Sequence, residues 1–380
     1  MIRLLSVQPV AERGGSDQAL LRMVRSLPSD EFDCHIVVPG PSPMHAELTG
    51  AGATLHVVPM RRLSTSHGAL DWLAYGAGWP VAVGRLTRLT RRLDIDVVHT
   101  NSLHSLYGWA AARLTGRPHV WHAREIVVQS RAALRLERFL ARRFAARVIA
   151  MSEAVAAQLD HANVEVIYES VDADEFRPEL AGRFRGTVGI ADDVPLVGSA
   201  GRIDSWKGID VLLAAFPLVR ADRPDAVMVI AGLPVVGKER LFAELEARAG
   251  AIPAVEWLGP RADMPELLAD LDVFVLPSSE PEPYGLVAVE ALASGAPVVV
   301  TEAGGAPEVV ARAAAGSGRS VARRDPAALA RAILELLPEP GGTGAAIRRR
   351  RPARQPAGDE RFAALFREVA PGRGRHRAVG

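Results

Sequence analysis

The sequence predicts an α/β protein with two doubly wound domains. Its 380 residues exceed what one hydrophobic core usually supports, so two domains of ordinary size are expected. Short apolar runs alternate with helical patterns along both halves of the chain, which favours mostly parallel sheets. The stretch from Val171 to Pro178 interrupts this alternation and has the character of a linker. We therefore expect a first domain at 1–170 and a second at 171–340.

In the first half, seven apolar segments are predicted strands, and the segments between them include three with helical periodicity. The predicted strands are Ile2–Val7, His35–Pro39, Thr54–Val58, Val97–Thr100, His119–His122, Arg147–Ala150 and Val164–Tyr168. The predicted helices are Asp17–Ser26, His104–Thr115 and Ala133–Ala145.

The second half repeats the alternation, and its end departs from it. The predicted strands are Pro195–Gly201, Ala226–Ala231, Val255–Leu258, Asp272–Leu276 and Val298–Val300. Residues 341–380 are predicted to be a flexible basic tail, with the arginine run Arg348–Arg351 and one helix at about 359–370. In that helix Phe362, Leu365, Phe366 and Val369 have the spacing of one apolar face.

Composition excludes several classes of protein. Hydrophobic residues make up 48% and charged residues 23%, which is typical of a globular protein, and the formal net charge of +1 gives no general attraction to nucleic acid. Cys34 is the single cysteine, which rules out an intramolecular disulfide and fits a reducing compartment. The first strand lacks the long apolar region of a signal peptide, and the apolar stretch Trp72–Gly84 is too short to span a bilayer. We predict a cytoplasmic location.

Two glutamates, Glu282 and Glu290, provide the strongest functional signal. They stand eight residues apart where a loop with Pro and Gly enters an apolar helical segment. A helix N-terminus offers unpaired N–H groups to phosphate, and the two carboxylates would reach different parts of one ligand. Predicted strands precede and follow this segment, so the glutamates belong to a βαβ unit at the carboxyl end of a sheet, where ligands bind. A nucleotide sugar fits this pattern better than the alternative of two solvated glutamates.

Arg202 and Lys207 follow the first predicted strand of the second half. A nucleoside diphosphate that leaves a sugar gains negative charge, which cationic side chains or a metal ion must offset. A guanidinium fork and a compact ammonium complement each other around two phosphates. The alternative is a pair of solvated surface charges. The residues alone leave both roles open.

Two Asp-x-Asp pairs formally resemble a metal-binding signature. Asp94 and Asp96, like Asp270 and Asp272, each lead into an apolar strand and so stand at its amino end. We interpret them as turn residues between helix and strand. The sequence also has no cluster of His and Cys, so we predict no metal and no cofactor besides the substrate nucleotide.

These motifs together resemble the retaining glycosyltransferases of family 4. The resemblance rests on Glu282-x7-Glu290 with Gly-Ala-Pro-Val-Val after it, on Gly201-Arg-Ile-Asp-Ser-Trp-Lys-Gly208, on Ala303–Val309 and on Gly14-Gly15. It implies the GT-B fold, in which two Rossmann-like domains face a central cleft that holds the active site. It also implies that the C-terminal helix packs back on the first domain.

The resemblance further implies a role for each candidate residue. Glu282 would bind the 3- or 4-hydroxyl of the sugar, and Glu290 the ribose hydroxyls. The resemblance also favours the phosphate role for Arg202 and Lys207. Catalytic roles fall to Glu282, Arg202, Lys207 and His122, the last as a contact to the sugar. The substrate-binding set is Gly15, Arg202, Lys207, Glu282, Tyr284, Gly285, Leu286 and Glu290. Transfer would retain the sugar's configuration, with a leaving phosphate oxygen taking the acceptor proton.

The acceptor is less defined than the donor, which we expect to be linked to UDP or GDP. Small molecules, sugars and lipid-linked acceptors all fit, and His99, His104, Arg124 and Glu125 are further candidates for acceptor contact. The segment Met60–Asp94 carries arginines and two tryptophans and could touch a membrane. Other functions stay open: a sugar phosphorylase, a nucleotide-sugar epimerase or a non-catalytic nucleotide-sugar binder. A dehydrogenase is disfavoured because the first strand is not followed by Gly-x-Gly-x-x-Gly.

Overall fold

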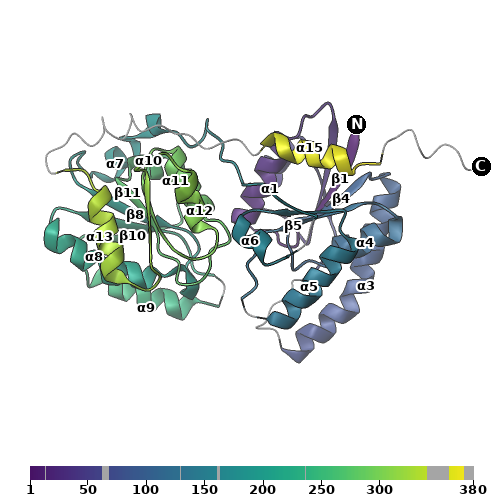
Figure 1. Cartoon of the computed structure of the whole chain (residues 1–380), viewed down its shortest axis with the longest axis horizontal. Helices are drawn as coiled ribbons and strands as arrows, with labels where there is room; N and C mark the ends of the chain where they lie inside the picture. Colours follow the sequence, from purple (N-terminus) through teal and green to yellow (C-terminus); the bar gives the residue numbers. More distant parts are fainter. Residues whose placement is uncertain are drawn as a thin grey trace, which may run out of the picture. The chain divides into compact units, whose positions relative to one another are not determined.

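The chain divides into two compact units. The structure, a computed structural model, describes residues 1–12, 14–61, 68–128, 130–160, 163–235, 237–339 and 359–371. The first unit comprises Met1–Ser170 and Ala357–Gly380, and the second comprises Val171–Pro356 (Figure 1). The predicted flexible tail, with Arg348–Arg351, lies outside the described residues apart from positions 359–371.

The first unit is built on a seven-stranded parallel sheet in the order β3-β2-β1-β4-β5-β6-β7. Its strands are β1 (Ile2–Val7), β2 (Phe32–Val38), β3 (Thr54–Val57), β4 (Val97–Thr100), β5 (His119–Ala123), β6 (Arg147–Ala150) and β7 (Val164–Val166). Its helices are α1 (Gly15–Ser26), α2 (His45–Gly50), α3 (Ala69–Arg92), α4 (Tyr107–Thr115), α5 (Arg131–Phe144), α6 (Glu153–Ala157) and α15 (Asp359–Val369). The strand order reverses between β1 and β4, as in a Rossmann fold.

Both faces of this sheet are covered by helices. Successive residues of a strand point to opposite faces, so Leu4 packs with α1, α2 and α15 while Leu5 packs with α3 and α4. Phe362 and Phe366 of α15 are 1% and 0% exposed in the core of the first unit, although about 200 residues separate them from its other helices (Figure 1). The C-terminal helix is therefore an integral part of the first unit.

The second unit has a six-stranded parallel sheet in the order β10-β9-β8-β11-β12-β13. Its strands are β8 (Leu196–Ala200), β9 (Val227–Ala231), β10 (Val255–Gly259), β11 (Val273–Leu276), β12 (Val298–Thr301) and β13 (Gly318–Val321). Its helices are the 3₁₀ turns η1 (Pro178–Leu180) and η2 (Ser205–Lys207), and α7 (Arg183–Val188), α8 (Ile209–Asp222), α9 (Glu239–Gly250), α10 (Met264–Asp270), α11 (Leu286–Ala293), α12 (Ala306–Arg312) and α13 (Pro326–Leu336). The reversal here lies between β8 and β11.

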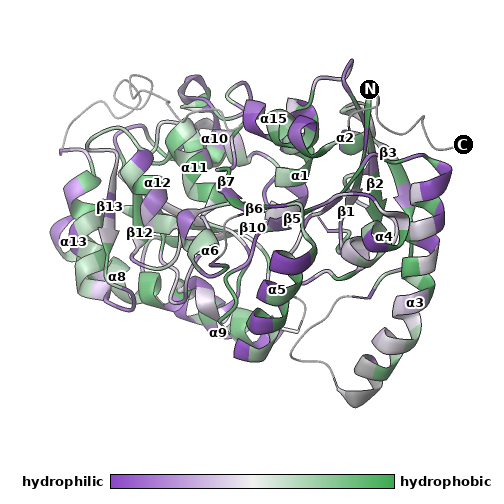
Figure 2. Ribbon diagram, turned by 45° about the vertical axis from the view of Figure 1, so that its right-hand side comes forward, coloured by the Kyte–Doolittle hydropathy of each residue, from purple (hydrophilic) through white to green (hydrophobic). Residues whose placement is uncertain are grey.

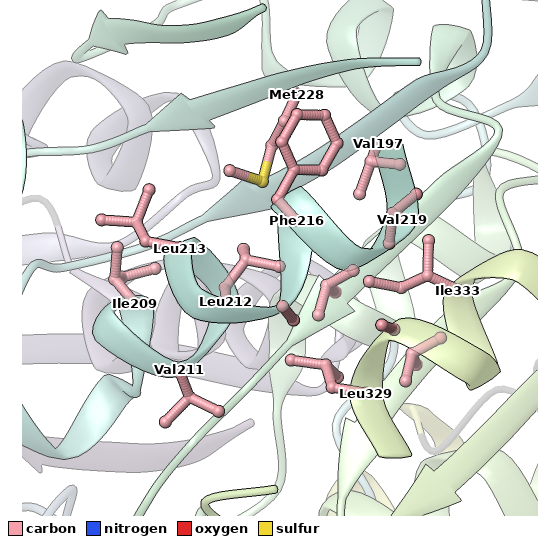
Figure 3. Packing of buried hydrophobic residues seen from close by; sticks show 14 of the residues in the cluster. Val197, Ile209, Val211, Leu212, Leu213, Phe216, Val219, Met228, Leu329 and Ile333 are labelled. Atoms are coloured by element: carbon pink, nitrogen blue, oxygen red, sulfur yellow. The ribbon is translucent and has the colours of Figure 1, made fainter. Parts of the chain in front are cut away.

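One face of the second sheet packs on α8, α9 and α13. Phe216 of α8 is fully buried, and Figure 3 shows it beside Met228 of β9 and Val197 of β8. Ile333 of α13 lies in the same cluster. Helices α11 and α12 contact the strands as well. The central strands are therefore covered by helices and hold the loops at their carboxyl ends in fixed positions.

The observed boundaries differ from the predicted ones at a few places. Strand β2 begins at Phe32, three residues before the predicted start, because Phe32 is buried in the first core. Helix α4 begins at Tyr107, because residues 101–106 form the loop after β4 instead of a helical turn. Strand β13 was not predicted, since Gly-Arg-Ser-Val is only partly buried and has no apolar run. Among the helices that the structure describes, none is both long enough and apolar enough to cross a lipid bilayer.

Candidate active site

The main candidate residues of the second unit come together where its strand order reverses. The loop with Arg202 and Lys207 follows β8, and the loop with Glu282 follows β11, its neighbour in the sheet. Both loops start at the carboxyl ends of parallel strands, so they emerge side by side at the edge where doubly wound sheets bind ligands. Main-chain bonds join them: the carbonyl of Trp206 accepts from the N–H groups of Ser279 at 2.7 Å and Glu280 at 3.3 Å.

Lys207 and Glu282 form a direct ion pair at this edge. Lys207 Nζ lies 2.7 Å from Glu282 Oε2, and their side chains are 18% and 8% exposed. Ser278 Oγ donates to the same carboxylate oxygen at 2.9 Å. The main chain of Glu282 is also fixed, since its N–H donates to Ala303 and its carbonyl accepts from Gly305. A phosphate and a sugar hydroxyl could therefore be held by adjacent groups of opposite charge.

Gly208 allows the two loops to approach this closely. Its φ is +69°, a left-handed conformation that favours glycine, and it ends η2 directly after Lys207. A Cβ atom added there would lie 2.0 Å from the carbonyl oxygen of Pro277. Any side chain at this position would push apart the loops that carry Lys207 and Glu282.

The other predicted residues of the second unit lie in the loop after β8 and at or just before α11. Arg202 is exposed in the loop that follows β8. Tyr284 is 1% exposed, and Gly285, with φ of +97°, precedes the first residue of α11, Leu286. Glu290 is 9% exposed, in the second turn of this otherwise apolar helix. Their predicted contacts with sugar and ribose stay predictions.

In the first unit, the Gly14-Gly15 turn is held by a buried chain of hydrogen bonds. Asp17 accepts from the N–H of Gly14 at 3.4 Å and from Gln8 Nε2 at 2.9 Å, and Asn101 Nδ2 donates to Gln8 at 2.7 Å. Burial raises the pKa of Asp17 to about 6, against the lowering effect of the Gln8 bond. No atom lies within 4 Å of where a Cβ on Gly15 would be, so packing does not require glycine there. The part of Gly15 in substrate binding, which the family resemblance implies as a loop against the donor diphosphate, stays a prediction.

His122 is enclosed within the first unit. It is 0% exposed, its Nδ1 lies 3.4 Å from His99 Nε2, and its ring lies 5.8 Å from that of Phe362. Its Nε2 is 3.4 Å from Glu169, which also accepts from Arg124 at 2.6 Å. Burial lowers the pKa of His122 to about 4, so the ring is neutral at pH 7. The side chain is fully enclosed by its neighbours in this structure. Its predicted contact with the sugar stays a prediction.

The Asp-x-Asp pairs have structural partners. Asp272 accepts from Arg185 Nη2 at 2.9 Å, and Asp270 accepts from the N–H of Arg185 at 2.9 Å. Asp96 accepts from the N–H of Arg3, and Asp94 pairs with Arg3 and Arg117. These bonds fix the amino ends of β11 and β4. In the part of the chain that the structure describes, no three His, Cys, Asp or Glu side chains are grouped to hold a metal ion.

Sequence reasoning missed two residues at the site, Ser278 and Trp206. Ser278 bonds to Glu282, and Lys207 Nζ lies over the Trp206 ring, 4.1 Å from its centroid. Ser278 could have been noticed, because it follows a buried strand at its carboxyl end, four residues before Glu282. The Trp206 contact had no comparable signal, since an aromatic residue beside a lysine is more often incidental.

Comparison with known proteins identifies the family. Residues 182–354 match the model of the glycosyl transferases group 1, and residues 14–167 match that of the glycosyl transferase 4-like domain. The chain belongs to the group 1 glycosyltransferases. This confirms the resemblance that the motifs indicated.

Relatives and solved structures agree with this assignment. A D-inositol 3-phosphate glycosyltransferase of Streptomyces avermitilis is 32% identical over 278 residues, which cover 64% of this chain and 58% of that protein. The lipopolysaccharide core mannosyltransferase LpsB of Rhizobium meliloti is 31% identical over 240 residues, 56% of this chain and 68% of that protein. The chain thus spans under three fifths of the first relative's length. HepE of Anabaena, solved with UDP and glucose, superposes with a TM-score of 0.75 at 24% identity, over 97% of this chain and 99% of HepE. The fold is GT-B, as predicted.

Proposed function

We propose that this protein transfers a sugar from a nucleoside diphosphate to a hydroxyl group of an acceptor. The proposal rests above all on the contact between Lys207 and Glu282 at the point where the strand order of the second sheet reverses. A cation and a carboxylate share this ligand-binding edge, as a diphosphate joined to a polyhydroxylated sugar requires. Membership of the group 1 glycosyltransferases supports the same function.

The proposed mechanism assigns one task to each group. Lys207 and Arg202 offset the negative charge that develops on the departing diphosphate, which is the largest electrostatic change in the reaction. Glu282 accepts hydrogen bonds from the sugar hydroxyls and orients the ring, and Glu290 does the same for the ribose. Because these charges come from side chains, we propose that transfer needs no divalent ion. We also propose that it retains configuration, with the acceptor proton passing to a leaving phosphate oxygen.

The relatives suggest the chemical class of the donor and of the acceptor. HepE was solved with UDP and glucose, and a relative in Corynebacterium glutamicum is described as GDP-mannose-dependent. We therefore propose a hexose donor linked to UDP or GDP. Acceptors named among the relatives include a phosphorylated inositol and a phosphatidylinositol mannoside. We propose a phosphorylated, sugar or lipid-linked acceptor. We also propose a cytoplasmic location, because a chain with a single cysteine can form no intramolecular disulfide and fits a reducing compartment.

We further propose peripheral contact with an anionic lipid surface, and α5 is the element that supports it. Leu136 and Phe139 are 50% and 61% exposed on its outer face, and Val128, just before it, is 55% exposed. Exposed arginines 131, 135, 142 and 143 flank them in the sequence, and Figure 2 shows hydrophilic and hydrophobic stretches alternating along α5. Exposed apolar side chains among arginines suit the boundary between anionic headgroups and acyl chains. Helix α3, in the segment that the sequence indicated, also exposes Leu73 (70%) and Val81 (54%), whereas Trp79 is partly buried against its own unit and the Trp72 side chain lies outside the described residues.

The test is a transfer assay with variants of the ion pair. Glu282→Ala and Lys207→Ala should each lower turnover by roughly 100-fold or more, because each removes a preorganised charge at the reacting centre. The measurement is release of UDP or GDP from UDP-glucose and GDP-mannose, with and without acceptor and with EDTA present. Arg240 and Glu244 form an exposed ion pair on α9 and supply the matched controls, Arg240→Ala and Glu244→Ala, and thermal unfolding checks that each variant is folded.

Several outcomes would contradict the proposal. Full activity in either ion-pair variant would remove the assigned roles, and strict dependence on Mg²⁺ would remove the metal-free mechanism. Sugar release only with inorganic phosphate would indicate a phosphorylase. Interconversion of the sugar while it stays attached to the nucleotide would indicate an epimerase.

A further inference from the structure

Trp206 lies at the candidate site and has no part in the proposed mechanism. It lies in η2 between Ser205 and Lys207. Lys207 Nζ is 4.1 Å from the centroid of its ring, within the range of an attractive cation–π contact. The same ammonium is 2.7 Å from Glu282. The ammonium thus lies between an aromatic face and a carboxylate.

These two contacts differ in what they do to the ammonium. Glu282 pairs with its charge, and under the proposed mechanism that carboxylate must also bind sugar hydroxyls. The indole ring carries no net charge, so it holds the ammonium in place while leaving its positive charge for an incoming phosphate. A lysine has four rotatable side-chain bonds and loses conformational entropy when it is fixed, so a second contact pre-organises it.

The backbone of Trp206 has a separate function. Its carbonyl accepts from the N–H groups of Ser279 and Glu280 and so joins the loop of Lys207 to the loop of Glu282. Every side-chain substitution keeps this carbonyl. The contribution of the indole can therefore be measured apart from that of the loop connection.

We propose that Trp206 is a positioning residue that orients Lys207 toward the diphosphate of the donor. This inference rests on the proposed function and extends it, because it gives the indole a part in nucleotide affinity. Trp206 need not touch the substrate, and its effect passes through the ammonium of Lys207.

Calorimetric titration with UDP and with GDP tests the inference, using the nucleotide that the wild-type protein binds. Trp206→Leu should weaken binding by roughly threefold to tenfold, the range expected for a lost cation–π contact, and Trp206→Phe should restore most of it. In a Lys207→Met background, Trp206→Leu should have no further effect, because the two side chains act as one unit. Ser205→Ala, at the exposed neighbour in η2, is the matched control and should bind like the wild type.

Each outcome decides the matter. If folded Trp206→Phe binds as weakly as Trp206→Leu, or if Trp206→Leu weakens binding equally without Lys207, the inference is overturned and the proposed function stands. If Trp206→Leu binds like the wild type, the inference fails in the same way. If the wild-type protein binds neither UDP nor GDP, the proposed function fails, and this inference with it.

Discussion

At the scale of single residues, the ion pair between Lys207 and Glu282 is better explained by function than by stability. Their side chains are largely buried, and removing two charges from water offsets much of their mutual attraction. The pair is therefore better explained by a role of its two charges in binding substrate than by a contribution to stability. The lysine and the glutamate could be predicted from the sequence because each belongs to a motif. Their contact, across 75 residues of chain, depends on β8 and β11 being neighbours, which the alternation of strands and helices does not determine.

Gly208 provides a residue-scale prediction. Gly208→Ala should lower the free energy of unfolding by more than Gly189→Ala does. The two glycines have the same backbone conformation, but only at Gly208 would the added methyl group collide with neighbouring atoms. Gly208 has φ of 69° and ψ of 23°, and Gly189 has φ of 76° and ψ of 25°. Strain alone should cost about 1 kcal/mol at Gly189, where an added Cβ meets nothing within 4 Å. At Gly208 the Cβ also meets the Pro277 carbonyl.

Urea denaturation of the two variants, together with nucleotide titration, measures this difference. Gly208→Ala should also weaken UDP or GDP binding, because the loop of Lys207 must shift to admit the methyl group. Equal losses of stability in the two variants, with unchanged nucleotide affinity in both, would show that the close approach at Gly208 does not matter.

At the scale of elements, the sequence predicted every strand that the structure describes except β13. Strands such as β11 and β12 are buried on both faces and read as continuous apolar runs. Strand β13 lies at the edge of its sheet, is only partly buried and contains Arg319 and Ser320, so its sequence has no strand signal. For helix α15, the helix itself could be predicted from the spacing of its apolar residues. That it packs on the sheet of the first unit could be predicted only from the family resemblance.

Helix α5 carries the element-scale prediction. The double variant Leu136→Ser/Phe139→Ser should bind vesicles that contain phosphatidylglycerol at least about tenfold more weakly than the wild type, since burying each side chain contributes roughly 1.5–3 kcal/mol. Co-sedimentation measures the loss. Wild-type binding should weaken at high salt and on purely phosphatidylcholine vesicles, because the arginines supply an electrostatic part.

Leu218→Ser is the matched control for α5, because Leu218 is 47% exposed on α8 of the second unit. It should leave vesicle binding unchanged. A wild-type protein that ignores anionic vesicles, or a double variant that binds them fully, would refute the lipid contact.

At the scale of the whole molecule, the histidines are distributed unevenly. Residues 171–356 contain none of the ten, whereas the first unit buries His99, His119 and His122. Burial lowers the pKa of His119 to about 3 and that of His122 to about 4, and it holds that of His99 well below its usual value. Two units whose sheets share the order of six strands should therefore respond differently to acid.

The sign of this response follows from proton binding. Between about pH 6.5 and pH 4 the unfolded chain binds protons at these histidines and the folded unit does not, so their contribution to stability is complete above pH 6.5 and is lost on acidification. Each of His119 and His122 contributes on the order of 3–5 kcal/mol over its range. Asp17, whose pKa is raised to about 6, works in the opposite direction by about 3 kcal/mol, because the folded unit takes up its proton first. The histidines outweigh it, so the first unit should lose stability as the pH falls.

Calorimetry at pH 7.5 and pH 5 should therefore show two transitions, with the one from the first unit moving to lower temperature in acid while the other moves less. Limited proteolysis assigns each transition to its unit. His119→Asn should flatten the pH dependence of the first transition, because it removes one buried titrating ring, and His45→Asn, at an exposed position on α2, should leave the dependence unchanged. If both transitions shift together, or if His119→Asn keeps the full pH dependence, acid unfolding has a cause other than the buried rings. The carboxylate of Glu169 is not that cause in this range, because its pKa, against the raising effect of burial, is held at about 2 by Arg124 and His122, which places its loss of stability below pH 4.5.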